Sequence, residues 1–361
     1  MNWLRHFFLL PFSWVYGFLT AIRNRLYDAR WLRSYRFDIP VISVGNLSMG
    51  GTGKSPHILY LLSVLHPKYR TAVLSRGYKR KTTGFYLAKQ DSTAREIGDE
   101  PLLFSRLYPD VPVAVAEDRL VAIPHLCQQV NNLDVILLDD AFQHRQVHPG
   151  LNILLTDFTQ LYTDDAIFPL GTLRESPSAA RRADIIIVTK SPEALPTMDK
   201  EQIIRKLNPH QWQKLYFSSI RYGSFYAFAK PDESIHIPSD THVLLLAGIA
   251  NPFPLETRLR TIYSNLTSRY FSDHHLFTRW DMESILETWN HLPPHKIIVT
   301  TEKDAVRLLP YTDWLNAQGI VIAVIPIFVY FEPDEREKFI SDILLYMQYK
   351  ALKTERDGID L

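Results

Sequence analysis

Apolar runs and helical segments alternate through the first half of the chain. Runs that are apolar almost throughout lie at residues 40–44, 71–74, 111–116, 134–138, 152–155 and 184–189. Strands without a polar face are typical of a parallel sheet that helices cover on both sides. Between these runs, Lys54–His66 and Glu117–Val130 have the spacing of helices. The pattern predicts a doubly wound, mostly parallel α/β domain with ligands at the carboxyl ends of its strands.

This alternation stops at residues 216–238, where aromatic and turn residues replace it. It restarts with a strand at 242–247, a helix near 255–264, a strand at 296–300 and a helix from Glu302. A chain of 361 residues favours two domains. We expect an N-terminal segment over residues 1–36, a first domain over 37–225 and a smaller α/β domain over 226–361.

The N-terminal segment has its own pattern, because residues 7–22 are apolar and aromatic and arginines follow. The run is shorter than the ~20 residues of a membrane-spanning helix and contains Pro11. No small-residue cleavage site follows it, which argues against a signal peptide. An interfacial helix with Trp3, Trp14 and Tyr16 at headgroup depth fits best. A helix packed on the protein's own core is the alternative.

Charge and cysteine content narrow the functional classes. A net charge of +1 gives no general attraction to nucleic acid. Six arginines lie between Arg5 and Arg36, and Asp28 is the one acidic residue among them. This basic composition suggests that the N-terminal segment binds an anionic surface. Cys127 is the only cysteine, so an internal disulfide and a thiolate metal site are excluded, and a reducing cytoplasm is favoured.

A glycine-rich turn ending in Gly-Lys-Ser follows the first apolar run. Such a P-loop directs backbone N–H groups at nucleotide phosphates, while its lysine reaches the β- and γ-oxygens and its hydroxyl holds Mg²⁺. Ser48 stands where the strict motif has glycine. A turn that only caps a helix would leave Lys54 unexplained at the positive helix end. The residues expected to bind the nucleotide are Asn46, Ser48, Gly50, Gly51, Thr52, Gly53, Lys54 and Ser55.

Acidic residues supply the metal candidates. Asp139 and Asp140 follow an apolar strand, as Walker B carboxylates do, although adjacent aspartates are also common in turns. Asp99 and Glu100 precede an apolar helix, where an N-cap role is the simpler interpretation.

Two further motifs lie in the second half of the chain. His274 and His275 are adjacent, so they do not share a helix face and a metal pair is disfavoured, although one of them could be a proton partner at a domain cleft. Thr301 and Asp304 have capping-box spacing.

The chain resembles the tetraacyldisaccharide 4'-kinase family of lipid A biosynthesis from residue 10 to about residue 308. The motifs that carry the resemblance are Leu-Pro-Phe-Ser-Trp-Val-Tyr-Gly (10–17), Gly-Asn-Leu-Ser-Met-Gly-Gly-Thr-Gly-Lys-Ser-Pro (45–56), Ser-Arg-Gly-Tyr (75–78), Gly-Asp-Glu-Pro (98–101), Leu-Asp-Asp-Ala-Phe-Gln-His (138–144), Leu-Arg-Glu (173–175), Asp-His-His (273–275) and Thr-Glu-Lys-Asp-Ala-Val (301–306).

The resemblance implies ATP- and Mg²⁺-dependent phosphorylation of the 4'-hydroxyl of a lipid A disaccharide 1-phosphate, at the cytoplasmic face of the inner membrane and without an obligate protein partner. It places the base on Asp99, assisted by His274, with Lys54 as the third catalytic residue. The metal candidates it implies are Ser55, Glu100, Asp139 and Asp140. The substrate candidates are Arg76, Gln143, His144 and Arg174.

Three residues depart from the family pattern: Lys79 and Ala141 replace glycines and Ser55 replaces the commoner threonine. None removes a catalytic group, but the first two put local backbone shape in doubt. The competing classes are a membrane-associated P-loop ATPase or GTPase switch and a scaffold with an inactive P-loop. Against a GTPase, the Asn-Lys-x-Asp motif that reads guanine is replaced by Thr-Lys-Ser-Pro at 189–192.

Overall fold

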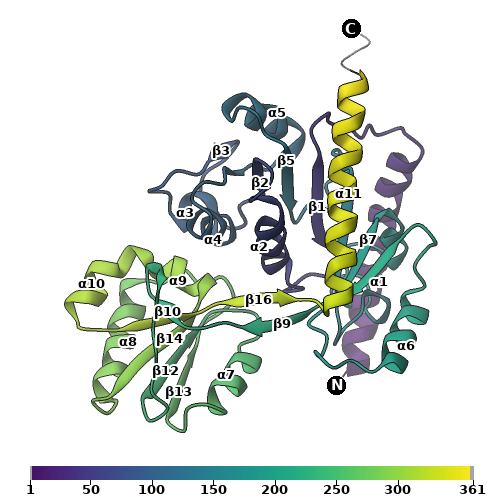
Figure 1. Cartoon of the computed structure of the whole chain (residues 1–361). Helices are drawn as coiled ribbons and strands as arrows, with labels where there is room; N and C mark the ends of the chain where they lie inside the picture. Colours follow the sequence, from purple (N-terminus) through teal and green to yellow (C-terminus); the bar gives the residue numbers. More distant parts are fainter. Residues whose placement is uncertain (1, 358–361) are drawn as a thin grey trace.

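The computed structural model describes the backbone of residues 2–357 and the side chains of residues 7–349. Two sheets with flanking helices lie side by side, and a two-stranded ribbon joins them (Figure 1). A long helix at each end of the chain lies along the first of these units (Figure 1).

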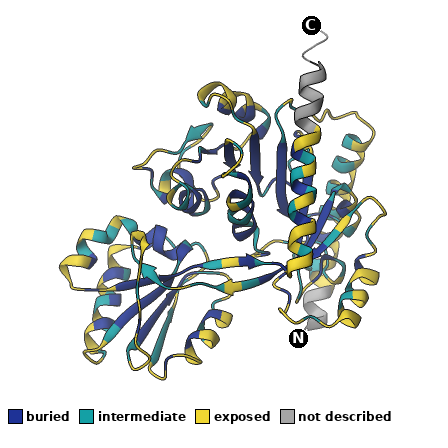
Figure 2. Cartoon of the chain, viewed as in Figure 1, coloured by how far each residue is buried: buried dark blue, intermediate teal, exposed yellow. Residues whose placement is uncertain are grey.

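The first unit is an eight-stranded sheet in the order β3-β4-β2-β5-β1-β6-β7-β8. Its strands are β1 (Val41–Asn46), β2 (Thr71–Ser75), β3 (Tyr86–Leu87), β4 (Val113–Val115), β5 (Val135–Asp139), β6 (Leu151–Asp157), β7 (Ile185–Thr189) and β8 (Lys214–Phe217). All neighbours pair in parallel except β3 and β4. Every residue of β1, β2, β5 and β7 is buried, as their continuous apolar pattern predicts (Figure 2).

Helices cover both faces of this sheet. They are α2 (Lys54–Leu65), α3 (Ala94–Ile97), α4 (Asp99–Leu107), α5 (Arg119–Gln129) and α6 (Thr197–Leu207), with 3₁₀ turns η1 (Tyr162–Asp164) and η2 (Pro177–Arg182). Ile58, Leu61, Leu62 and Leu65 of α2 all lie in the core on one face of the sheet, which confirms the helical spacing. The predicted P-loop α/β architecture is therefore present.

The second unit is a six-stranded sheet in the order β11-β10-β15-β14-β12-β13. Its strands are β10 (Tyr226–Ala227), β11 (Lys230–Ser234), β12 (His242–Ala247), β13 (Leu266–Tyr270), β14 (Lys296–Thr301) and β15 (Ile322–Ile325). Its helices are α7 (Phe253–Arg260), α8 (Arg279–His291), α9 (Glu302–Leu308) and α10 (Thr312–Ala317), with a 3₁₀ turn η3 (Leu309–Tyr311).

The ribbon consists of β9 (Ser219–Tyr222) and β16 (Ile327–Tyr330), which pair antiparallel. After it, α11 (Pro333–Asp357) returns to the first unit, where Phe339, Ile343 and Met347 join the core around α2. The structure therefore differs from the expected division at 226–361: the second unit ends at the ribbon, and the last helix belongs to the first. Apolar positions in α11 did not reveal which sheet they would cover.

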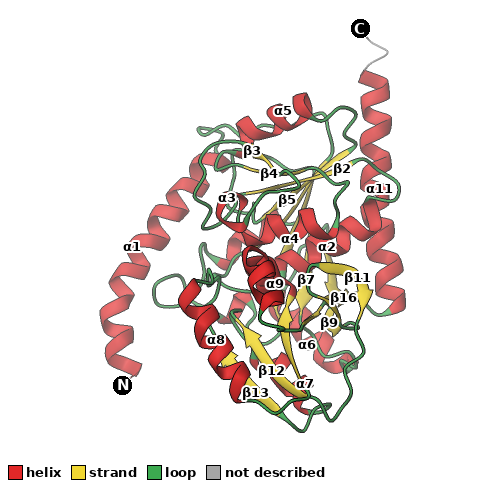
Figure 3. Cartoon of the chain, turned by 90° about the vertical axis from the view of Figure 1, so that its left-hand side faces the viewer, coloured by secondary structure: helices red, strands yellow, loops and turns green. Residues whose placement is uncertain are grey.

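Helix α1 (Asn2–Asp28) runs along the outside of the first unit (Figure 3). Its buried or partly buried side is largely polar or small and consists of Leu9, Ser13, Tyr16, Gly17, Thr20, Arg23, Asn24, Leu26 and Tyr27. Its aromatic side points away from the protein, with Phe7, Phe8, Phe12, Trp14 and Phe18 all more than 60% exposed. The alternative of a helix packed through its apolar face is therefore wrong for these residues. Trp3 and Arg5 lie outside the residues whose side chains are described.

No helix within residues 2–357 is long and apolar enough to cross a membrane.

Candidate active site

The P-loop joins the end of β1 to the start of α2. Gly50 and Gly53 take left-handed φ angles of 112° and 88°, which glycine adopts without strain. Ser48 forms an isolated antiparallel bridge with Leu173, so its backbone is extended and needs no glycine. Asn46 Nδ2 donates to Thr52 Oγ1 at 2.7 Å and closes the loop from within.

Lys54 lies between two acceptors at the edge of the sheet. Its Nζ is 3.5 Å from Asn46 Oδ1 and 3.7 Å from Asp140 Oδ1. Asp140 also accepts from Arg174 Nη1 at 2.9 Å, so two cations share one carboxylate. The P-loop lysine is thus held by weak, long contacts that phosphate oxygens could replace.

Asp139, at the end of β5, is buried next to these groups. Its Oδ2 accepts from Ser75 Oγ at 2.9 Å, whereas its Oδ1 has no hydrogen-bond partner although it is buried. Burial, together with the charges of Glu100 and Asp140, raises the pKa of Asp139 to about 7. Crowded carboxylates with an unpaired oxygen indicate a place for a cation.

The structure brings Asp99 and His274 together across the two units. His274 Nδ1 lies 2.7 Å from Asp99 Oδ2 although the residues are 175 positions apart. Arg307 Nε donates to the same oxygen at 2.9 Å. Burial alone would raise the pKa of Asp99, but the hydrogen bond from His274 and the charge of Arg307 hold it well below its usual range. Asp99 is the first residue of α4 rather than its N-cap, which is Gly98.

Glu100 connects the P-loop to the second unit. It accepts hydrogen bonds from Ser55 Oγ and from Lys303 Nζ. Burial would raise the pKa of Glu100, but the charge of Lys303 lowers it to about 2. Glu100 therefore connects Ser55 of the P-loop to the neighbouring Asp99–His274 pair.

Two of the substrate candidates are connected to Asp140: Arg174 by two hydrogen bonds, and Gln143 through Arg174. Gln143 accepts from Arg174 Nη1 at 3.3 Å and donates to the backbone oxygen of Asn46 at 2.8 Å. His144 Nε2 lies 3.7 Å from Asp118, and burial followed by the charge of Arg119 lowers the pKa of His144 to about 4. Arg76 is exposed.

Sequence reasoning missed three cations at this site. Lys303 and Arg307 lie in α9, where the Thr301–Asp304 spacing was assigned to capping. Thr301 does cap the helix, accepting from Asp304 N–H. The signal available was the presence of two cations four residues apart after a strand end. Arg119 is buried and donates to the backbone oxygen of Asp139 at 3.2 Å, and no sequence pattern indicated it.

The departures at Lys79 and Ala141 have different outcomes. Lys79 takes a left-handed φ of 59°, the conformation that glycine favours, so the turn keeps its shape at some cost in strain. Ala141 is buried and needs no positive φ.

Within the described residues, no group of three or more His, Cys, Asp or Glu side chains is arranged to hold a metal ion by itself. This fits Mg²⁺, which is usually held by one or two carboxylates together with substrate phosphates. The unpaired Asp139 Oδ1 and the Ser55 hydroxyl fit such a shared site.

A phosphate loop, a buried acidic strand end and a carboxylate–histidine pair at one edge of a doubly wound sheet define a P-loop phosphotransferase.

A family model described as tetraacyldisaccharide-1-P 4'-kinase matches residues 5–345, and the chain belongs to this family. It is 43% identical over 355 residues to the tetraacyldisaccharide 4'-kinase of Bacteroides thetaiotaomicron, covering 95% of this chain and 93% of that protein. It is 47% identical over 309 residues to the enzyme of the same name from Flavobacterium johnsoniae, covering 85% and 88%.

A solved structure of a related protein has the same fold. The crystal structure of LpxK from Aquifex aeolicus in complex with ATP has a TM-score of 0.73 and 28% identity, covering 94% of this chain and 98% of that one. The family, the fold and the kinase class inferred from the motifs are confirmed, and the switch protein is not favoured.

Proposed function

We propose that this chain transfers the γ-phosphoryl group of ATP to the 4'-hydroxyl of a tetraacyldisaccharide 1-phosphate and so forms lipid IVA. Family membership supports the acceptor, and the related Aquifex structure supports ATP as the donor. The observation that carries the proposal is the bond between Ser55 of the P-loop and Glu100, because it places the phosphate loop directly beside the Asp99–His274 pair.

Lys54 is the cation proposed to draw charge from the transferring phosphoryl group. Phosphoryl transfer depends mainly on positioning and on neutralised charge, so a lysine aimed at the γ-phosphate stabilises the transition state directly. The long contacts of Lys54 to Asn46 and Asp140 leave it able to turn toward a nucleotide.

Ser55, Glu100, Asp139 and Asp140 are the residues proposed to hold Mg²⁺. When bound, the ion would neutralise charge on the β- and γ-phosphates. The unpaired, buried oxygen of Asp139 supports this assignment.

Asp99 is proposed to align the sugar hydroxyl and to accept its proton together with His274. The short contact between Asp99 Oδ2 and His274 Nδ1 supports a shared proton path through the pair. A weakly basic carboxylate is sufficient here, because a loose transition state needs little proton transfer to the base.

Helix α1 is proposed to lie in the cytoplasmic surface of the inner membrane. Its polar side is bonded to the protein and its aromatic side is exposed, which is the reverse of a helix in a soluble core. A multi-acylated acceptor stays in the bilayer, so the enzyme must meet its sugar at that surface. Arg174 is proposed to bind the 1-phosphate or the sugar from the protein side.

The test is phosphate transfer from γ-labelled ATP to tetraacyldisaccharide 1-phosphate in mixed micelles, with and without Mg²⁺. Lys54→Ala should lower turnover at least ~100-fold, as loss of a transition-state charge partner does elsewhere. The exposed Lys89→Ala is the matched control and should retain wild-type turnover. ATP hydrolysis that is indifferent to the glycolipid would overturn the proposal in favour of a switch protein.

A further inference from the structure

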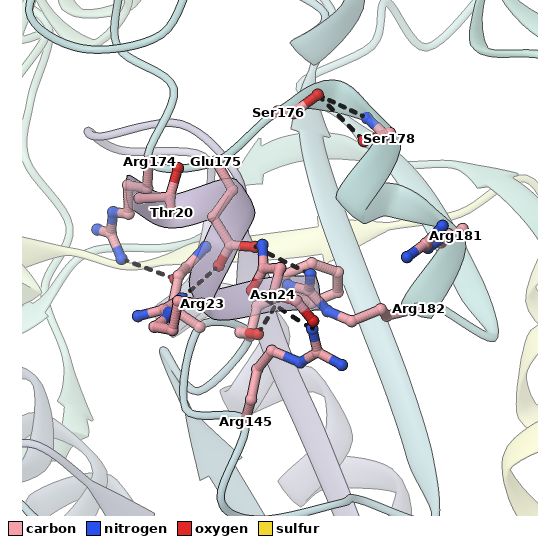
Figure 4. Close-up of polar contacts among 12 residues, drawn as sticks. Thr20, Arg23, Asn24, Arg145, Arg174, Glu175, Ser176, Ser178, Arg181 and Arg182 are labelled. Atoms are coloured by element: carbon pink, nitrogen blue, oxygen red, sulfur yellow. Dashed lines mark hydrogen bonds and ion pairs between the residues drawn. The ribbon is translucent and has the colours of Figure 1, made fainter. Parts of the chain in front are cut away.

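A buried carboxylate outside the acid–base pair ties α1 to the first unit. The Glu175 side chain is fully buried, and Figure 4 shows it among side chains from α1 and from the loops beside it. It accepts from Arg23 Nη2 at 3.2 Å, from Asn24 Nδ2 at 2.8 Å and from Arg182 Nη1 at 2.9 Å. A buried charge requires such partners, so this contact has one favourable arrangement.

The same stretch of α1 is also bonded to the loop after β5. Arg145 Nη1 donates to the backbone oxygen of Asn24 at 2.8 Å, and its Nη2 donates to Asp28 at 2.7 Å. Arg182 Nη2 donates to the backbone oxygen of Phe142 at 3.2 Å, with its guanidinium 4.6 Å from the ring centroid. Residues 142–145 are thereby fixed relative to α1.

The loop after β5 and the loop that contains Glu175 both carry candidate residues of the active site. Arg174 directly precedes Glu175 and donates to Asp140 Oδ1 at 2.9 Å and Oδ2 at 3.1 Å. Its backbone N–H donates to the oxygen of Leu47 in the P-loop at 2.7 Å. Moving Glu175 would therefore move Arg174, and with it the carboxylate that faces Lys54.

The contacts of Ser13 and Gly17, farther from the C-terminal end of α1, involve no charged group. Ser13 Oγ donates to the Ile167 backbone oxygen and accepts from the Leu170 N–H, each at 2.9 Å. Gly17 lies against Ile167, where an added Cβ would come within 3.0 Å of that side chain. Among the described residues, Glu175 is thus the fully buried charged side chain that contacts α1.

We propose that Glu175 is a positioning residue that makes α1, Arg174 and Asp140 one rigid unit, so that the orientation of the exposed aromatic side of α1 fixes the orientation of the acceptor side of the active site. The role of α1 at a lipid surface rests on the proposed function. The mechanical link itself depends only on the contacts of Glu175.

Glu175→Gln is the first test, because it keeps the shape and removes the charge. Turnover on acceptor embedded in anionic phospholipid vesicles should fall at least ~10-fold, and turnover on detergent-dispersed acceptor should fall less. The dissociation constant for ATP and the vesicle-bound fraction should stay within twofold of wild type. Glu193→Gln, which breaks an exposed ion pair with Arg221, is the matched control and should change none of these values.

Hydrogen exchange provides a readout that does not need the reaction. In Glu175→Gln, the amides of residues 23–28 and 140–145 should exchange faster together, while those of β12 in the second unit should not change. If Glu175→Gln does not fold, Asn24→Ala decides, because it removes the bond to Glu175 and a long bond from Arg145, and leaves Arg182 to neutralise the carboxylate.

Wild-type turnover on vesicles in a folded variant, or faster exchange confined to residues 23–28, would overturn the inference. If wild-type protein phosphorylates no glycolipid, the proposed function fails, and the exchange experiment still decides the link.

Discussion

Asp99 shows how a residue acquires its chemistry from distant partners. Asp99 begins α4, where its Oδ1 accepts a hydrogen bond from the backbone N–H of Glu100 at 3.0 Å. The second unit then adds His274 and Arg307 at Oδ2. A role confined to the first turn of α4 accounts for the first of these contacts and for neither of the others.

We therefore predict that Asp99→Asn lowers glycolipid phosphorylation by ~10²–10³-fold while the dissociation constant for ATP stays within twofold. Asparagine is nearly isosteric but cannot accept the hydroxyl proton. The variant should also melt at a lower temperature, because Arg307 loses a buried charge partner. Single-turnover kinetics below the melting temperature separate the two effects, with the exposed Asp110→Asn as control.

His274→Ala should cost less turnover than Asp99→Asn and should alter the pH dependence of the rate, because the carboxylate loses one proton partner but remains charged beside Arg307. A folded Asp99→Asn with wild-type turnover would return Asp99 to a structural role.

At the scale of the element, α1 has a mostly polar side that contacts the protein and an aromatic side that is exposed. Its apolar residues are too many for one stripe, and the side that docks on the protein is the polar one. Docking through Ser13, Asn24 and Arg23 leaves the aromatic side chains without protein partners for most of their surface. A soluble helix would bury those side chains, since each contributes roughly 1.5–3 kcal/mol on burial.

Replacing Phe12, Trp14 and Phe18 by serine should release the protein from anionic vesicles while its fold and ATP affinity stay unchanged. Co-sedimentation at low and high salt measures the effect, and we expect the bound fraction to fall at least ~5-fold at high salt, where the arginines are screened. Trp280→Ser, at a tryptophan of the second unit that is more exposed than Trp14, is the control. Equal binding by the triple variant and the wild type would show that α1 is not the anchor.

At the scale of the whole molecule, the two units meet through ionic contacts, through the packing of Val306 of α9 against Leu102 and Leu103 of α4, and through one narrow ribbon. Glu302 is the first residue of α9 and lies beside the start of β16, where its Oε2 accepts from the Ile327 backbone N–H at 3.4 Å. Burial raises the pKa of Glu302 to about 7, despite the hydrogen bonds from Ile327 and Tyr226. The folded protein therefore favours the neutral acid at this junction.

A carboxyl group with a raised folded-state pKa contributes stability below its unfolded value, near 4.5, and loses that contribution as pH rises through about 7. Glu302→Gln should thus gain stability relative to wild type as pH rises from 5 to 8, reaching on the order of 1–3 kcal/mol. Thermal melting across this range measures the difference. The exposed Glu287→Gln is the control, and a constant difference across pH would contradict the assignment.

Local sequence by itself determined eight of the strands, which are β1, β2, β4, β5, β6, β7, β12 and β14, together with the helix after the P-loop. It also singled out the residues that are proposed to bind the phosphates. Their signals are short-range: strand burial follows from continuous apolar runs, and the P-loop follows from glycines beside one lysine. The pairing of Asp99 with His274 came from resemblance and not from spacing, because 175 residues separate them.

Only the tertiary structure decided the parts that depend on which surfaces meet. It placed Lys303 and Arg307 on the acidic residues of the other unit, returned α11 to the first sheet and turned the polar side of α1 inward. Each of these results depends on contacts between segments far apart in the chain. A local pattern predicts which side of an element is apolar or polar, but the complete fold determines which segment packs against that side.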